Sequence, residues 1–320
     1  MDGRNEPVTL SQEAWPNILG DARTVAESLP DLLVEARQIA NTVSAGWHGR
    51  RRAGPGETFW QFRPFNMGEP AKRIDWRRSA RDDHLYVRER EWEAAHTVWM
   101  WSDLSPSMAY RSRLSQTSKR DRALVIMLGL ADLLARGGER IGLTGLTRAT
   151  ADRNAAEKVA TALSHISKPV PLPDTHAVGR FSDVVLIGDL LDPIEDLSAW
   201  ARTVMAAGAR GHLVQVLDPI EETFPFSGRT EFRDPESGLR LVTGRAESWR
   251  EAYHARLAAH RGALADLASR AGWTFMVHHT DRPAVEPLLG LHSRLADNAD
   301  EVAPARPSAF GPASAPIGGS

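Results

Sequence analysis

Thr97–Met108, TVWMWSDLSPSM, joins an apolar run to a short polar loop. The uncharged residues Thr97–Trp101 are typical of a strand that is buried on both faces, as the central strands of parallel sheets are. Asp103, Ser105 and Ser107 follow at alternate positions where this strand ends. Their side chains are hard oxygen ligands, and open α/β sheets place their sites at the carboxyl ends of strands. The stretch therefore predicts a divalent-cation site at the end of a central strand.

Strand and helix patterns alternate downstream of this stretch. We expect strands at 97–103, 140–146, 183–187, 212–217 and 272–279, helices at 118–136, 153–166, 193–207, 246–271 and 283–297, and a hairpin at 229–243. Repeated β-α units indicate a mostly parallel sheet with helices on both faces. The predicted fold class is α/β.

A second carboxylate follows another predicted core strand. Gly188-Asp189 ends the strand at 183–187, so Asp189 could share the sheet edge with Asp103. The alternative is a turn or helix-capping aspartate, a role that Asp192 before Pro193 could also fill. For Asp218-Pro219 and Asp281, which also end strands, we favour capping or turn roles.

The two ends of the chain differ from its middle. Residues 1–27 are polar and show no periodicity, and residues 303–320 are small and Pro-rich, so we expect both to be poorly ordered. Between residues 28 and 46, apolar side chains recur at helical spacing after a possible Ser28 cap, with Pro30 in the first turn. We divide the rest into an N-terminal segment, 28–96, and an α/β domain, 97–297.

Residues 46–96 combine Gly–Pro turns, aromatic residues and dense charge, and His84–Arg90 alternates like a strand. Arginine beside aromatic side chains is typical of protein-binding hot spots. The candidate contact residues are Arg63, Arg73, Trp76, Arg77 and Arg81. The alternative is an internal network in which these arginines pair with Glu57, Glu69, Asp75 and Asp82. Nucleic-acid binding is a third interpretation, which the interleaved acids oppose because they weaken attraction to phosphate.

Composition excludes several classes of protein. The 320 residues carry a net charge of −2, which argues against bulk attraction to nucleic acid or anionic membranes. The absence of cysteine excludes disulfides, thiol catalysis and iron–sulfur clusters. No signal-peptide pattern is present, and the longest apolar run, Ala123–Ala135, is shorter than the roughly 20 residues that span a bilayer. There is no Walker A sequence, no G-x-G-x-x-G after a strand and no G-x-S-x-G elbow. We therefore expect a cytoplasmic protein.

The segment Gly56–Arg81, with FWQFRPF and IDWRRSAR, followed by DLSPSM, resembles the DUF58 family over roughly residues 30–297. The resemblance implies a von Willebrand factor A-like, Rossmann-like core with the N-terminal irregular and β segment packed beside it. It also implies a metal-ion-dependent adhesion site for Mg²⁺ or Mn²⁺. Asp103, Ser105 and Ser107 match its first part, Asp189 its last, and Thr175 in LPDTHAV is the best match to its threonine. Only seven residues separate Thr175 from the strand at Asp183, fewer than the helix usually found there needs.

The resemblance further implies partners: a MoxR-type AAA+ ATPase and an unidentified client protein. The expected function is that of a non-enzymatic adaptor or co-chaperone in the maturation or assembly of other proteins. Two alternatives remain. One is a metal-dependent hydrolase or phosphotransferase that uses the same carboxylates, for which the sequence offers no evident general base. The other is a scaffold that has kept the sheet and lost the ion.

Overall fold

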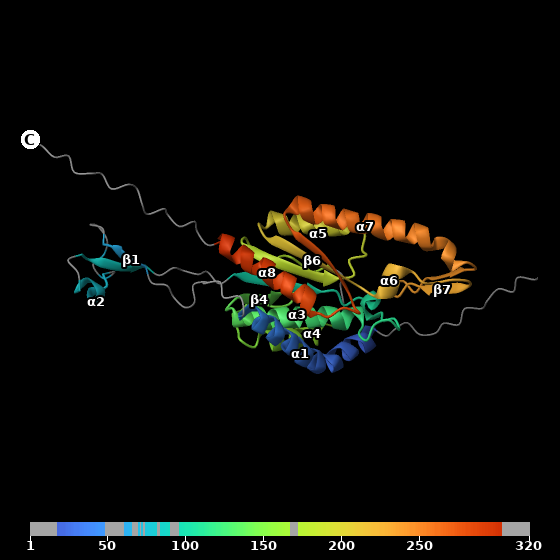
Figure 1. Cartoon of the computed structure of the whole chain (residues 1–320), viewed down its shortest axis with the longest axis horizontal. Coiled ribbons are helices and arrows are strands. Elements are labelled where there is room, and N and C mark those ends of the chain that lie inside the picture. Colours follow the sequence, from blue (N-terminus) through green and yellow to red (C-terminus); the bar gives the residue numbers. More distant parts are fainter. Residues whose placement is uncertain are drawn as a thin grey trace, which may run out of the picture.

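The centre of the molecule is a five-stranded sheet in which every neighbouring pair is parallel. The computed structural model describes residues 18–48, 61–65, 70, 72, 74–81, 84–89, 96–166 and 172–302. The strands are β3 (Thr97–Ser102), β4 (Arg140–Leu143), β5 (Ser182–Gly188), β6 (Arg210–Leu217) and β9 (Thr274–His279), in the order β4-β3-β5-β6-β9 (Figure 1). The predicted parallel α/β sheet is confirmed, with β3 and β5 inside it.

Helices cover both faces of this sheet, as predicted. Val98 and Met100 of β3 pack in one core cluster, while Trp99 and Trp101 pack in the other, because successive side chains of a strand point to opposite faces. The first face is covered by α1 (Ile18–His48), α3 (Lys119–Arg136), α4 (Ala155–Leu163) and α8 (Val285–Val302), and the second by α5 (Ile194–Ala206) and α7 (Arg250–Ala271) (Figure 1). The two layers of helix bury β3 on both sides.

The first helix begins earlier than the sequence predicts. Helix α1 starts at Ile18 and contains Pro30, so the expected Ser28 cap is wrong, and residues 18–27, expected to be poorly ordered, are helical. The predicted apolar face is confirmed, since Leu32, Ala36, Ala40 and Val43 are buried in the same cluster as α3 and α8. Most helical stability comes from such packing, which here outweighs the hydrogen bond lost at a proline. Residues 1–17 and 303–320 lie outside the described part of the chain.

A small antiparallel unit precedes the sheet in sequence. Strand β1 (Gln61–Pro64) pairs with β2 (Tyr86–Glu89), which confirms the strand predicted near residues 84–90. Between them lies α2 (Trp76–Ser79), which is capped by Asp75, whose side chain accepts a hydrogen bond from the Arg78 N–H. Glu57, Glu69, Arg73 and Asp82 lie outside the described residues. The proposed internal ion-pair network therefore stays a prediction.

Short elements follow β6 at its carboxyl end. Helix α6 (Pro219–Thr223) leads to the hairpin of β7 (Thr230–Arg233) and β8 (Arg240–Thr243), which confirms the hairpin predicted at 229–243. The capping role predicted for Asp218 is also confirmed, since Asp218 and Glu221 form a reciprocal capping box at the start of α6. Among the described helices, none has the length and apolar content needed to cross a bilayer.

Candidate functional site

Asp103 and Asp189 lie side by side at the carboxyl edge of the sheet. Asp103 follows β3 and Asp189 follows β5, and these strands are hydrogen-bonded neighbours in which Ser102 faces Ile187. The Asp103 N–H continues the pairing by donating to the Ile187 carbonyl at 2.8 Å. Each aspartate is only 4% exposed. Two buried carboxyl groups from separate β-α units therefore meet at the sheet edge.

The two serines connect these carboxyl groups. The Ser105 N–H donates to Oδ1 of Asp103 at 2.8 Å. The Oγ atoms of Ser105 and Ser107 are 3.1 Å apart, and the Ser107 hydroxyl donates to Oδ2 of Asp189 at 2.8 Å. Four of the five predicted ligand residues thus form one hydrogen-bonded cluster.

The fifth predicted residue, Thr175, is not joined to this cluster. Its backbone carbonyl accepts a hydrogen bond from the Val178 N–H at 2.9 Å, inside the loop that precedes β5. The neighbouring Asp174 lies against Gly145, in the turn after β4. Within the described residues, the structure gives the Thr175 hydroxyl no hydrogen bond to Asp103 or Asp189. The short loop that carries Thr175 therefore lies beside the turn that follows β4.

A buried lysine that the sequence analysis did not single out completes the cluster. Nζ of Lys119 lies 3.0 Å from Oδ2 of Asp189 and 2.7 Å from Oε1 of Glu221, and the Lys119 side chain is 1% exposed. Lys119 is the first residue of α3, after the Ser118 cap. A lysine in the first turn opposes the helix dipole, and this is the signal that could have marked it. Its partners Asp189 and Glu221 are distant in sequence, so this signal does not predict that they pair with Lys119.

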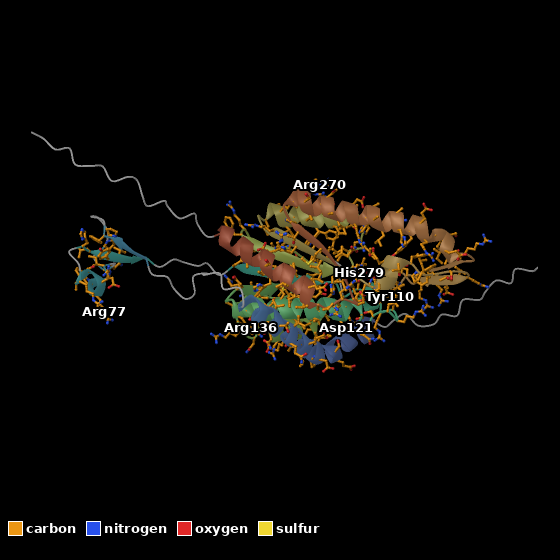
Figure 2. The ribbon with its side chains drawn as sticks, viewed as in Figure 1. Arg77, Tyr110, Asp121, Arg136, Arg270 and His279 are labelled. Atoms are coloured by element: carbon orange, nitrogen blue, oxygen red, sulfur yellow. The ribbon has the colours of Figure 1, made fainter. Side chains whose placement is uncertain are left out.

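Further polar side chains surround this edge (Figure 2, near Tyr110 and His279). Glu236, in the turn of the β7–β8 hairpin, accepts a hydrogen bond from the Ser107 N–H at 2.9 Å. The Gln215 amide donates to the Asp189 carbonyl at 2.9 Å. Beside it, Arg261 pairs with Glu222 and donates to Gln215. The hairpin, β6 and α7 therefore all contribute to the edge.

The acidic groups of the edge repel one another. Burial, and then the charge of Asp189, raise the pKa of Asp103 to about 7, against the opposing hydrogen bonds from Ser105. Burial, and then Asp189, also raise the pKa of Asp192. Burial alone would lower the pKa of Lys119, but the nearby charges of Asp189 and Glu221 outweigh it and raise that pKa. The charge of Lys119 therefore offsets only part of the negative charge that raises the pKa values of Asp103 and Asp192.

These residues fit a divalent cation in their donor chemistry and charge. Carboxylate and hydroxyl oxygens are the ligands that Mg²⁺ prefers, and a cation would relieve the repulsion that raises the pKa of Asp103. Among the described residues, no group of three or more His, Cys, Asp or Glu side chains is arranged to hold an ion. The hydroxyls of Ser105 and Ser107 would therefore have to supply part of the shell.

Comparisons with known proteins place the chain in a family. Residues 61–263 match the family described as "Protein of unknown function DUF58". The uncharacterized proteins Rv1480 of Mycobacterium tuberculosis and Mb1516 of Mycobacterium bovis are each 26% identical to it over 281 residues, covering 82% of this chain and 87% of theirs.

Two solved structures are also similar to the chain. One is the conserved hypothetical protein BatB from Bacteroides thetaiotaomicron, at 17% identity and a TM-score of 0.38, covering 63% of this chain and 100% of that one. The other is an aerotolerance-related membrane protein from Bacteroides fragilis, at 17% identity and a TM-score of 0.40, covering 65% and 100% of the two chains.

Proposed function

The chain belongs to the DUF58 family, and from this premise we propose that it is a non-enzymatic adaptor that binds other proteins through the carboxyl edge of its sheet. In this proposal Asp103, Ser105, Ser107 and Asp189 hold Mg²⁺ or Mn²⁺ on a von Willebrand factor A-like core. The observation that carries it is the continuous chain of hydrogen bonds from Asp103 through both serines to Asp189. The ion, when bound, would offer a coordination position to an acidic side chain of a partner.

A contact within the chain supports the capture of an acidic side chain. The exposed Glu236 brings its carboxylate to the Ser107 N–H at 2.9 Å, although 129 positions separate the two residues. A backbone N–H is a strong donor to a carboxylate, and such charge-assisted bonds are about twice as strong as neutral ones. The outer side of the DLSPS loop therefore already receives a carboxylate from a separate surface element.

Exposed apolar side chains next in sequence to these residues favour a protein as the partner. They come from the loop after Ser107, the residue pair after Asp189 and the hairpin that carries Glu236: Tyr110, Leu114, Leu191, Leu239 and Leu241, with exposed fractions of 40%, 51%, 46%, 72% and 57%. Protein interfaces combine such apolar contacts with a few polar anchors. An acidic residue with apolar neighbours is the partner feature that suits this arrangement.

The partners proposed are a MoxR-type AAA+ ATPase and an unidentified client protein in the cytoplasm. The small β1–β2 unit offers a second contact surface, because Trp76 is 61% exposed and Arg77 and Arg81 are exposed beside it in sequence (Figure 2). Arg63 and Arg73 belong to the same proposed surface, and their side chains lie outside the described residues. A bare tryptophan with arginine neighbours is typical of binding hot spots.

The test is capture of the ATPase by the full chain in the presence of Mg²⁺, and then of EDTA. We expect Asp103→Ala to abolish capture and EDTA to have the same effect on the wild type. Asp152→Ala is the control, because Asp152 is a partly exposed aspartate that pairs with Lys158 and not with the residues of the proposed ion site. Trp76→Ala in the same assay tests the second surface. Undiminished capture by Asp103→Ala in EDTA would contradict the proposal.

One observation favours an enzyme as the second candidate function. A general acid or base works best when its pKa lies near the working pH, and the pKa of Asp103 is raised to about 7. Asp103 could therefore be the general acid or base of a metal-dependent hydrolase or phosphotransferase at this edge, provided that other residues hold the metal, because a cation bound to Asp103 would lower its pKa. Turnover of phosphoester or peptide substrates by the purified protein with Mg²⁺, lost in Asp103→Asn, is the result that would favour this candidate.

A further inference from the structure

Lys119 is the largest of the fully buried residues in the described part of the chain. Its ammonium lies between Asp189 and Glu221, at 3.0 and 2.7 Å. Burying an ammonium is costly unless charged partners surround it. The first turn of α3 does not favour it either, because the amino end of a helix carries positive partial charge. The two carboxylates are therefore what holds Lys119 in place.

One of these carboxylates also belongs to the proposed ion site. Oδ2 of Asp189 accepts hydrogen bonds from both the Lys119 ammonium and the Ser107 hydroxyl. A cation that coordinates this oxygen meets the ammonium, which has the same sign of charge. Two cations at one carboxylate repel each other, and the repulsion is strong where water is scarce. Ion and lysine therefore compete for Asp189.

Glu221 gives the lysine a second position. It comes from α6 rather than from the strand ends, and its other oxygen, Oε2, accepts a hydrogen bond from the Asp218 N–H at 2.8 Å. Glu221 is therefore held by a contact that does not involve Asp189. Lys119 can leave Asp189 and keep Glu221 as a carboxylate partner, so its displacement does not leave a buried ammonium unpaired.

We propose that Lys119 is an intramolecular competitor of the divalent ion: its ammonium occupies Asp189 when the ion is absent, and this sets how tightly the ion binds. The inference rests on the proposed ion site and adds a residue that controls its affinity. Ion binding then moves Lys119 from Asp189 toward Glu221. Removing the positive charge at position 119 increases ion affinity, and keeping it does not.

Isothermal titration of the full chain with Mg²⁺ and Mn²⁺ tests the proposal. Lys119→Gln keeps a hydrogen-bond donor without the charge and should bind the ion about tenfold more tightly or better. Lys119→Arg keeps the charge and should bind no more tightly than the wild type. Lys158→Gln is the matched control, because this lysine of α4 is 59% exposed and pairs with Asp152 rather than with Asp189. It should leave ion affinity unchanged.

A second measurement needs no variant and covers the case in which Lys119→Gln does not fold. The buried ammonium of the wild type should give a slowly exchanging lysine ¹⁵N signal that shifts as Mg²⁺ is added. An unchanged signal at saturating Mg²⁺ overturns the competition. Equal ion affinity of the wild type and Lys119→Gln overturns it too, and leaves the ion site standing. Failure of both proteins to bind an ion removes the ion site as well.

Discussion

Gly188 and Asp103 approach each other so closely that a Cβ atom on Gly188 would lie 2.9 Å from Cβ of Asp103 and 3.6 Å from its Oδ2. A real side chain does not fit at that distance, so the glycine that ends β5 makes room for the aspartate that follows β3. We predict that Gly188→Ala lowers the free energy of unfolding by about 1 to 3 kcal/mol and displaces the Asp103 carboxyl group. Urea unfolding measures the first effect, and Mg²⁺ titration the second.

Gly262→Ala is the control for this substitution. Gly262 is an exposed residue inside α7, and an added Cβ atom meets nothing within 4 Å. Alanine in a helix interior is more favourable than glycine by roughly 0.5 to 1 kcal/mol, so this variant should be more stable than the wild type. A Gly188→Ala protein with wild-type stability and ion binding would show that the edge is loosely packed.

The ionised carboxylate of Asp103 should destabilise the folded protein when no ion is bound. Its pKa is about 7 in the folded protein against 3.8 as the ordinary value, so the native state holds a proton that the unfolded chain releases. The free energy of unfolding therefore falls as the pH rises from about 4 to about 7. Asp103→Asn removes this titration and should be more stable than the wild type at pH 8 by about 3 kcal/mol.

The measurement for this prediction is urea unfolding at pH 5 and pH 8 in EDTA. The gain in Asp103→Asn should be larger at pH 8, and the same variant should lose partner capture. A substitution that stabilises the fold and removes binding identifies a residue that serves function at the expense of stability. Lower stability of Asp103→Asn at pH 8 would contradict the unbalanced charge at this edge.

The sequence predicts that Asp103 and Asp189 lie at the same sheet edge, because local rules determine where each strand ends. Alternation of strand and helix puts the ends of β3 and β5 at one sheet edge, so Asp103 and Asp189 follow from the pattern alone. Lys119 could be recognised as an unfavourable residue in its helix turn, yet its pairing with Asp189 and Glu221 depends on how α3 and α6 pack against the sheet. No local rule relates residues so far apart in the chain.

The same limit explains two other differences. The hairpin that carries Glu236 is predicted at 229–243, but the contact of Glu236 with the Ser107 N–H depends on the direction of the whole hairpin. Helix α1 continues through Pro30 because its apolar face packs on α3, and a proline near a capping residue otherwise predicts a helix start. Tertiary packing outweighs the local signal in both places.

The opposite end of the sheet carries a buried cluster whose pH dependence has the other sign. Asp183 is bonded to His96 at 2.7 Å and to His212 at 3.2 Å. Burial alone would raise the pKa of Asp183, but the hydrogen bonds from His212 and His96 lower it to about 2. The ionised carboxylate therefore contributes stability above its ordinary pKa of 3.8, and this contribution is lost as the pH falls toward 2.

We predict that Asp183→Asn lowers the free energy of unfolding at pH 7 by roughly 2 kcal/mol and flattens its decline between pH 4 and pH 2. Urea unfolding across that range measures both effects. Asp196→Asn, at an exposed position of α5, should change stability by no more than about 0.5 kcal/mol. Equal stability of Asp183→Asn and the wild type at pH 7 would show that the negative charge of Asp183 beside the two histidines does not stabilise the folded protein.

The contact of Glu236 with the Ser107 N–H bears directly on partner capture. If the edge receives an acidic side chain, Glu236 holds one of its donors in the free protein and must leave when a partner arrives. We predict that Glu236→Ala strengthens capture of the ATPase about three- to tenfold, because the intramolecular competitor is gone. Its effect on stability should stay within about 0.5 kcal/mol, since the side chain is exposed.

Glu231→Ala separates this effect from a general change in charge. Glu231 is an exposed acidic residue of β7, and its carboxylate lies 3.6 Å from Arg240 rather than near Ser107. The variant removes the same charge from the same hairpin, so it should leave capture close to the wild-type value. Weaker capture by Glu236→Ala than by Glu231→Ala would mean that Glu236 contacts the partner itself. The hairpin would then be part of the binding surface instead of a competitor for it.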